Sequence, residues 1–213
     1  MNEPSARRPL KVRDVKLVNT FARYLSGKNI TPNQISVTSV FFALLAAACF
    51  LLFAHYSYWW LLILAGLMIQ CRLLCNLFDG MVAVEGGKST KSGELFNDIP
   101  DRVADPLILV SAGYAIHVVS YGGELGWCAG LFAVLTAYIR TLNASIGAPV
   151  DFKGPMAKQH RMAVLTIACV ITALEVVFRQ TDYTLLIALI VTVAGCVITC
   201  IRRTISAYRF LEA

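Results

Sequence analysis

Residues 76–105 have the sequence NLFDGMVAVEGGKSTKSGELFNDIPDRVAD and follow a long, almost uninterrupted apolar stretch. Asp79, Asp98, Asp101 and Asp105 gather in this window, together with two asparagines and a glycine-rich connection. Ionisable side chains beside lipid are costly and usually serve a function. Oxygen ligands are the ones that hard divalent cations prefer. The window therefore predicts a divalent-cation site beside a membrane and, with it, a bound phosphate group.

The chain as a whole is too apolar for an ordinary soluble domain. Of its 213 residues, 57% are hydrophobic and 15% are charged, and the mean hydropathy is +0.65. A helix that crosses a bilayer needs about 20 apolar residues. The sequence offers six such stretches, at 35–54, 58–82, 96–119, 125–146, 161–178 and 183–201. We therefore expect an all-α membrane protein whose six transmembrane helices form one domain over residues 35–213.

The positive charges predict how these spans are oriented, because cytoplasmic loops carry an excess of Lys and Arg. If the spans alternate, all of the 19 Lys and Arg residues except Arg72 and Arg179 lie on the side of the two termini. Both termini and the acidic window are therefore expected in the cytoplasm, with a bacterial inner membrane as the expected location. The net charge of +6 needs no nucleic-acid partner, since an anionic inner leaflet attracts basic segments.

Residues 1–34 are expected to form a cytoplasmic amphipathic segment. Apolar residues at 12, 15, 17, 18, 21, 22 and 25 are compatible with one helical face and are interleaved with Lys and Arg. A helix of this kind lies in the headgroup plane, whereas the alternative is a loosely solvated tail. Thr31 followed by Pro32 is typical of an N-cap and the first position of a helix. The first span is therefore expected to begin sharply at this point.

Helical spacing places the polar residues of the window on two faces. Residues three, four and seven apart share a face of a helix, and Arg72, Asn76, Asp79 and Ala83 follow that spacing at the end of the second span. The third span begins with Asn97, Asp98, Asp101 and Asp105, which fall within an arc of roughly 100°. The glycine-rich connection would let the two helices turn these faces toward each other.

A cation between the two faces would be coordinated by side-chain oxygens, which suit Mg²⁺ or Mn²⁺ better than zinc. Gly80 and Gly93 would let a phosphate approach because they carry no Cβ. The alternative is a set of helix-end charges in the headgroup layer, with Asp98 and Asp101 favoured at the positive start of a helix. That alternative does not explain why Asn76 and Asp79 are aligned at the end of an apolar helix.

The window resembles the signature of the CDP-alcohol phosphotransferase family, which is Asp-x2-Asp-Gly-x2-Ala-Arg, about eight residues, then Gly-x3-Asp-x3-Asp. At the same spacing this chain has Asn76-x2-Asp79-Gly80-x2-Ala83-Val84, eight residues, and Gly93-x3-Asn97-x3-Asp101. The resemblance extends to the six-helix layout, to the Thr-Pro-Asn sequence at 31–33 and to the segment GPMAKQHR at 154–161. It therefore covers nearly the whole chain.

The resemblance implies a transferase of phospholipid biosynthesis. Such an enzyme moves a phosphatidyl (phospho-alcohol) group from a CDP-alcohol such as CDP-diacylglycerol to an acceptor alcohol, and it releases CMP. The resemblance also implies Mg²⁺ or Mn²⁺ as the cofactor, a homodimer, and Asp101 as the catalytic base that activates the acceptor hydroxyl.

The expected site residues fall into three groups. The metal ligands are expected to be Asn76, Asp79, Asn97, Asp98 and Asp101. The CDP moiety is expected to contact Asn76, Gly80, Ala83, Gly93 and Asn97. The acceptor, expected to be a polar and phosphorylated or anionic alcohol, is placed near the basic residues Arg140, Lys158 and Arg161.

Three positions depart from the family signature. Its first and third aspartates are Asn76 and Asn97 here, and its arginine is Val84. In the family, the four aspartates hold a pair of divalent cations. An amide offers a dipole in place of a charge, so the loss of two carboxylates is expected to weaken or abolish one cation site. Asp98 and Glu85 are the residues best placed to compensate.

These departures leave two other functions open. The first is a catalytically weak relative that binds a nucleotide-lipid or regulates a partner enzyme. The second is a small cation carrier, because carboxylates in membrane spans often line ion paths. Against the carrier, the acidic window lies at one membrane surface, and few ionisable residues are expected near the midplane.

Overall fold

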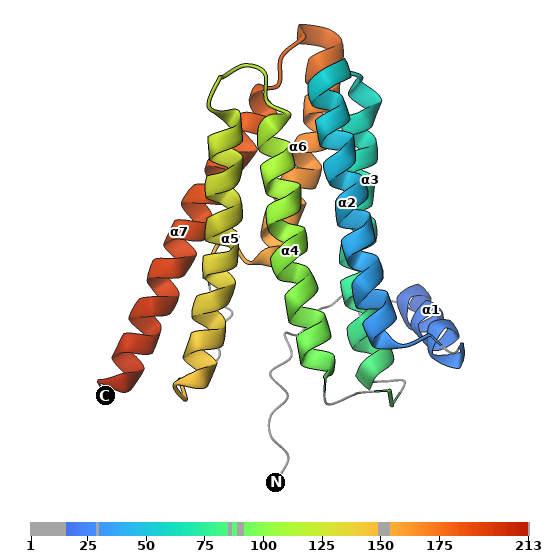
Figure 1. Cartoon of the computed structure of the whole chain (residues 1–213), viewed down its shortest axis with the longest axis vertical. Helices are drawn as coiled ribbons and strands as arrows, with labels where there is room; N and C mark the ends of the chain where they lie inside the picture. Colours follow the sequence, from blue (N-terminus) through green and yellow to red (C-terminus); the bar gives the residue numbers. More distant parts are fainter. Residues whose placement is uncertain (1–15, 29, 85–86, 89–91, 149–153, 213) are drawn as a thin grey trace.

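The computed structural model describes residues 16–28, 30–84, 87–88, 92–148 and 154–212. Within these residues the regular structure consists of seven α-helices. They are α1 (Lys16–Gly27), α2 (Pro32–Tyr56), α3 (Trp59–Val84), α4 (Gly93–Tyr114), α5 (Gly122–Ser145), α6 (Lys158–Arg179) and α7 (Tyr183–Leu211). The six long helices alternate in direction and form an elongated bundle (Figure 1). We call the end that holds α1, the start of α2 and the end of α3 the inner end, and the opposite end the outer end.

Five of the described helices, α2, α3, α5, α6 and α7, are long and apolar enough to cross a membrane. α4 has the necessary length, but Asp98, Asp101, Arg102 and Asp105 make its first half too polar. The prediction of an all-helical membrane protein is confirmed. The predicted span 96–119 ended too late, since α4 stops at Tyr114, whereas α7 begins at the predicted start of the span 183–201 and extends beyond its end. α7 continues through Arg202 and Arg203 because a helix does not have to end where its apolar part ends.

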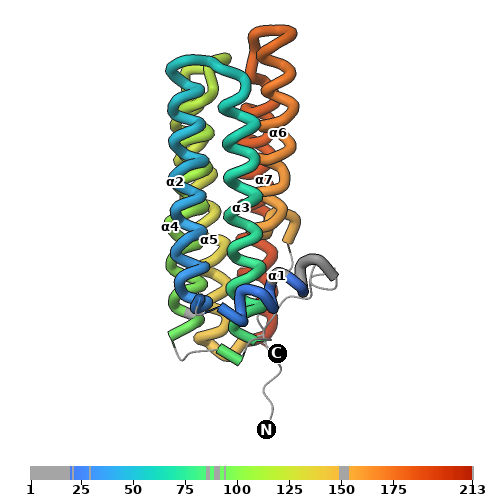
Figure 2. The backbone as a smooth tube through the Cα atoms, turned by 90° about the vertical axis from the view of Figure 1, so that its right-hand side faces the viewer, coloured from blue at the N-terminus to red at the C-terminus, as the bar shows by residue number. Residues whose placement is uncertain are grey.

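The helices pack in an order that differs from their order along the chain. α2 packs along both α3 and α4, α4 also packs on α5, and α5 packs on α7. α6 closes the bundle against α3 and α7. Figure 2 shows α1 lying across the inner end beside α3. In Figure 1, α6 begins well above the lower ends of α3 and α4, so it starts part-way along the bundle.

Local sequence signals explain how the inner end is built. Thr31 caps α2 as predicted: its hydroxyl accepts a hydrogen bond from the Gln34 backbone (3.2 Å), and the Gln34 side chain accepts one from the Thr31 backbone (2.9 Å). Lys88 donates to the backbone carbonyls of Ser26 and Lys28, both at 2.8 Å. The turn before α2 is thereby tied to the connection between α3 and α4. Ala22 of α1 is buried against the inner end of α3.

Glycines set the distance between α4 and α5. A Cβ placed on Gly126 would lie 2.9 Å from the Gly113 Cα, the Leu109 carbonyl oxygen and the Val110 carbonyl oxygen. A Cβ on Gly113 would lie 2.5 Å from the Gly122 carbonyl oxygen. Small residues of this kind let membrane helices pack backbone against backbone. The rigid pairing of α4 with α5 helps to hold the polar half of α4 in place.

We expect the substitution Gly126→Ala to destabilise the protein by about 1–3 kcal/mol, because the new methyl group meets backbone atoms that cannot move aside. The measurement is unfolding in mixed micelles with increasing denaturant. Gly27→Ala is the matched control, because a Cβ at Gly27 meets nothing within 4 Å. Equal stability of the two variants would show that the α4–α5 contact tolerates a side chain.

Candidate active site

The inner half of α3 carries one polar face in an otherwise apolar helix. Arg72 is completely buried and Asp79 is buried, while Asn76, between them, is half-buried. The spacing of four and three residues places the three side chains on one side of the helix. α3 thus directs an arginine, an amide and a carboxylate into the bundle at its inner end.

The first half of α4 divides its acidic residues between two environments. Asp101 and Asp105 lie one turn apart and are both buried. Asp98 is half-buried, and Asn97 is exposed. The four polar residues lie on one face of α4, as predicted, but only Asp101 and Asp105 are buried in the protein.

An alternating chain of charges joins α3, α4 and α6. The Lys158 ammonium is hydrogen-bonded to Asp101 Oδ2, and Arg72 Nη2 contacts Asp101 Oδ1 at 2.9 Å. The same Arg72 nitrogen lies 2.7 Å from Asp105 Oδ1, and Arg161 Nη2 lies 2.6 Å from Asp105 Oδ2. Two carboxylates of α4 are thus held by three cationic groups from its neighbours. The Arg72 and Arg161 pairs are nearly free of solvent, so each of these groups depends on its partners for its charge to be tolerated.

Two further hydrogen bonds complete this group. The Asn76 amide nitrogen donates to Asp101 Oδ1 at 3.2 Å, and the Ser36 hydroxyl of α2 donates to Asp79 Oδ2 at 2.6 Å. Asp79 also lies close enough to Lys158 and Asp101 for its charge to interact with both. We call Arg72, Asn76, Asp79, Asp101, Asp105, Lys158 and Arg161 the inner cluster. Its members come from α3, α4 and α6, and Ser36 adds a hydrogen bond from α2.

The structure places the remaining expected metal ligands outside the inner cluster. Asp98 forms ion pairs with Arg102 (3.0 Å) on its own helix and with Arg140 of α5 (2.9 Å). These side chains are about one-third exposed. Asn97 is exposed, and Glu85 lies outside the described residues. Asp98 and Arg140 thus form a separate rim pair.

The expected CDP-binding residues lie along the edge of the inner cluster. Gly80 follows Asp79 directly, and Ala83 is one turn further toward the inner end of α3. Both are half-buried. Gly93 is the first residue of α4, and Asn97 follows it by one turn. These positions lie at the inner ends of α3 and α4.

The three basic residues expected near an acceptor differ in their surroundings. Lys158 remains about one-quarter exposed while it contacts Asp101, and Arg140 remains about one-third exposed. Arg161 is buried, and besides Asp105 it donates to the Thr136 hydroxyl (3.1 Å) and the Met156 carbonyl (3.0 Å). Contact between Arg161 and an acceptor remains a prediction, and the burial of Arg161 argues against it.

Sequence reasoning missed Arg72, Asp105 and Ser36 as site residues. Arg72 carried a signal, because an arginine within an apolar span one turn before Asn76 is expensive unless it is paired. Asp105 carried a weaker one, being one turn after Asp101. Ser36 carried none, since its role depends on α2 packing beside Asp79.

The inner cluster offers donors that fit a divalent cation. Among the described residues no three His, Cys, Asp or Glu side chains converge as a metal site, so a cation would need amide oxygens as well. Asp79 Oδ1 is buried and has no hydrogen-bond partner in this part of the chain. A buried acceptor left unsatisfied is costly. Mg²⁺ is usually bound through one or two carboxylates together with substrate phosphates, so Asp79, Asp101 and Asn76 fit such an ion.

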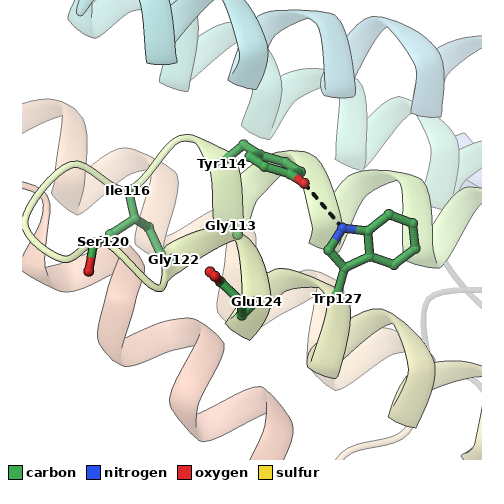
Figure 3. A pocket seen from close by; sticks show the side chains of 8 residues that line it. Gly113, Tyr114, Ile116, Ser120, Gly122, Glu124 and Trp127 are labelled. Carbon is green, nitrogen blue, oxygen red and sulfur yellow. Dashed lines mark hydrogen bonds between the residues drawn. The ribbon is translucent and has the colours of Figure 1, made fainter.

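Two pockets in the described part of the chain lie at the outer end, far from the inner cluster. One, of about 360 Å³, is lined by Tyr114, Glu124 and Trp127 among others, and the Trp127 indole donates to the Tyr114 hydroxyl at 3.2 Å (Figure 3). The other, of about 650 Å³, surrounds the His117–Asp182 pair. Asp101 and Gly113 are separated by three turns of α4, about 18 Å. Chemistry at the inner cluster is therefore independent of both pockets.

No family model matches the chain. Its sequence is similar to synthases of inositol-phosphate lipids. Phosphatidylinositol phosphate synthase of Streptomyces avermitilis is 24% identical over 200 residues, which cover 91% of this chain and 79% of the relative. Archaetidylinositol phosphate synthase of Pyrococcus horikoshii is 23% identical over 177 residues, which cover 81% of this chain and 82% of the relative.

The fold is also found in solved structures. The crystal structure of Mycobacterium tuberculosis phosphatidylinositol phosphate synthase with CDP-DAG bound matches with a TM-score of 0.73, at 17% identity, over 91% of this chain and 94% of that one. The same enzyme in complex with manganese and citrate matches with a TM-score of 0.72, at 17% identity, over 90% of this chain and 88% of that one. This likeness shows that the chain shares their fold.

Proposed function

We infer that the chain belongs to the CDP-alcohol phosphotransferase family and transfers a phosphatidyl group from CDP-diacylglycerol to an alcohol, with release of CMP. The inference is supported by the motif spacing, by the relatives named as synthases of inositol-phosphate lipids, and by the shared fold with an enzyme that binds CDP-DAG. One observation carries it most directly. Asn76 of α3 is hydrogen-bonded to Asp101 of α4, and Asp79 lies one turn further along α3.

In the membrane, α4 serves as the sixth span, because it runs the length of the bundle beside α2 and α5. Its buried carboxylates Asp101 and Asp105 are paired with Arg72, Lys158 and Arg161, and Asp98 is paired with Arg102 and Arg140. Exposed aromatic residues mark the outer interface, as expected of membrane proteins; they include Tyr56, Tyr58, Trp59, Trp60, Tyr114, Tyr121, Trp127 and Tyr183.

The inner end faces the cytoplasm, in agreement with the distribution of Lys and Arg. α1 lies in the headgroup layer, with Ala22 against α3. The protein resides in a bacterial inner membrane and acts as a homodimer. The division at residue 34 separates this interfacial segment from the six-helix domain.

The CDP moiety of the donor binds along Asn76, Gly80, Ala83, Gly93 and Asn97, while its acyl chains remain in the bilayer. A divalent cation, Mg²⁺ or Mn²⁺, would be held by Asp79 and Asp101 with the amide oxygen of Asn76, and Asn97 and Asp98 at the rim are the further candidate ligands. When bound, the cation supplies electrostatic neutralisation of the diphosphate and of the departing CMP.

Asp101 acts on the acceptor. It accepts the hydroxyl proton, the freed oxygen forms a bond to the lipid-side phosphorus, and the bond from that phosphorus to the CMP oxygen breaks. Arg72 and Asn76 orient the Asp101 carboxylate through Oδ1, and Lys158 contacts it through Oδ2. Arg161 and Asp105 hold Arg72 and the first half of α4 in register. Positioning and electrostatic stabilisation supply most of the rate.

The acceptor is a phosphorylated polyol that approaches Lys158 and Arg140 from the cytoplasmic side. Both side chains are partly exposed and basic, and the relatives are named for products with an inositol phosphate headgroup. Arg161, which the sequence also suggested for this role, contributes to the positive field of the site from its buried position.

One observation favours a second candidate function. Both oxygens of Asp101 are already engaged by Arg72, Asn76 and Lys158, and two motif carboxylates are amides. A protein that binds the nucleotide-lipid without turning it over, or that regulates a partner enzyme, would have these features. No comparable observation favours a cation carrier.

The purified protein in proteoliposomes, supplied with CDP-diacylglycerol and a panel of polyols and polyol phosphates, is expected to release CMP and to form one new phospholipid. Removal of divalent cations with EDTA is expected to abolish both, and Mn²⁺ or Mg²⁺ to restore them. Mass spectrometry of the lipids identifies the acceptor. Binding of CDP-diacylglycerol by calorimetry without any CMP would favour the binder over the enzyme.

A further inference from the structure

Lys158 occupies an unusual position for a membrane protein's lysine. It is the first residue of α6, which starts part-way along the bundle, and its ammonium contacts Asp101 directly. A lysine that merely flanked the membrane would extend to water at the inner end. This one instead neutralises the carboxylate on which the proposed chemistry depends.

The charges of the inner cluster are balanced without any metal. Asp79, Asp101 and Asp105 supply three negative charges, and Arg72, Lys158 and Arg161 supply three positive ones. Each of the two phosphoryl groups in the diphosphate of a bound CDP-alcohol adds one negative charge. A single divalent cation would restore neutrality once the diphosphate is bound, whereas two would leave an excess of positive charge in a site of low dielectric constant.

The carboxylates of Asp79 and Asp101 differ in the donors that already contact their oxygens. Asp101 contacts Arg72, Asn76 and Lys158, so its oxygens already have cationic or amide donors. Asp79 accepts a hydrogen bond from the Ser36 hydroxyl on Oδ2 and contacts no cationic donor directly among the described residues, and its Oδ1 is buried there with no hydrogen-bond partner. A cation is therefore best accommodated on the Asp79 side, and a second one beside Asp101 would meet the Lys158 ammonium.

We propose that Lys158 acts at Asp101 as a built-in cation that takes the place of a second divalent ion, so that each chain binds one divalent cation, on the side of Asp79. The proposal rests on the proposed function for the identity of the phosphate ligand. It also explains Asn76: its amide donates to Asp101, where a carboxylate would repel it. Lys158 is here a positioning and charge-balancing residue, and its role is separable from that of Asp101 as base.

The test is the stoichiometry and affinity of Mn²⁺ binding, measured by electron paramagnetic resonance on the full chain in detergent with CDP-diacylglycerol present. The wild-type protein is expected to bind one Mn²⁺ per chain, without the spin coupling of a close metal pair. Lys158→Gln is expected to bind Mn²⁺ at least tenfold more tightly or to bind a second ion, and Lys158→Arg to behave as wild type. Lys28→Gln, at an exposed lysine, is the matched control and is expected to change nothing.

Several results would overturn the proposal: two coupled Mn²⁺ ions per wild-type chain, no bound Mn²⁺, or Lys158→Gln indistinguishable from wild type. If Lys158→Gln does not fold, the number of Mn²⁺ ions bound per wild-type chain decides the outcome on its own. CMP release is measured in parallel, because the two ideas can fail separately. One Mn²⁺ that responds to Lys158→Gln without CMP release from any acceptor would remove the proposed activity and keep the role of Lys158. Two Mn²⁺ ions per chain together with CMP release would remove the role of Lys158 and keep the proposed activity.

Discussion

Replacing Asp101 with asparagine is expected to lower CMP release from CDP-diacylglycerol by roughly 10²- to 10⁴-fold, the usual contribution of a general base. The substitution keeps the size of the side chain and one oxygen, but it removes the group that takes the acceptor proton. The measurement is CMP release in proteoliposomes with Mg²⁺ and the acceptor identified by mass spectrometry. The maximal rate should fall far more than the apparent affinity for the donor changes.

Glu124→Gln is the matched control for this substitution, because it removes a carboxylate from the outer-end pocket and leaves the inner cluster unchanged (Figure 3). It is expected to retain full activity. The amount of monodisperse protein reports whether Asp101→Asn still folds, since Arg72 and Lys158 lose part of their partner. Turnover by Asp101→Asn equal to that of wild type would remove Asp101 from the role of base.

Replacing Arg72 with methionine is expected to destabilise the protein by about 3–5 kcal/mol, because Asp101 and Asp105 would lose the cation that they share inside the bundle. Methionine is similar in volume, so loss of packing contributes little. The measurement is the free energy of unfolding in mixed micelles with denaturant. The loss should be smaller when Asp105→Asn is added, since the two sites are coupled through one contact.

Arg102→Met provides the comparison with a solvated ion pair. Arg102 contacts Asp98 on the same helix, and both side chains are partly exposed. Pairs of this kind contribute about 0–1 kcal/mol, so this substitution is expected to have a small effect. If Arg72→Met costs no more than Arg102→Met, the inner cluster is not the buried network that its geometry indicates.

Much of the architecture could be predicted because it depends on local sequence. Five apolar stretches of sufficient length became helices long enough to cross a membrane. Thr31 and Pro32 begin α2 because a capping box needs only residues within one turn. The spacing of Asn76 and Asp79 predicted a polar face at the end of α3, and the spacing of Asp101 and Asp105 predicted one at the start of α4. Helical periodicity alone determines such faces.

The candidate site could be predicted only in part. Asp98 and Asp101 are three residues apart, yet Asp98 pairs with Arg140 at the rim while Asp101 is buried beside Arg72. The rotation of α4 against its neighbours decides this difference, and the tertiary packing sets that rotation. The family signature includes Asp101 and not Asp98, but the sequence alone could not show which of the two is buried, because it carries no information on that rotation.

The sequence by itself determined that this chain is a helical membrane protein with oxygen-bearing side chains at the adjoining ends of two helices, because hydropathy and helical period are properties of neighbouring residues. Only the tertiary structure decided which charges meet. Lys158 and Arg161 reach Asp101 and Asp105 because α6 begins part-way along the bundle and packs on α3. Ion pairs between residues more than 50 positions apart depend on that packing, and the free energy of burying a charge makes each of them depend on all the others.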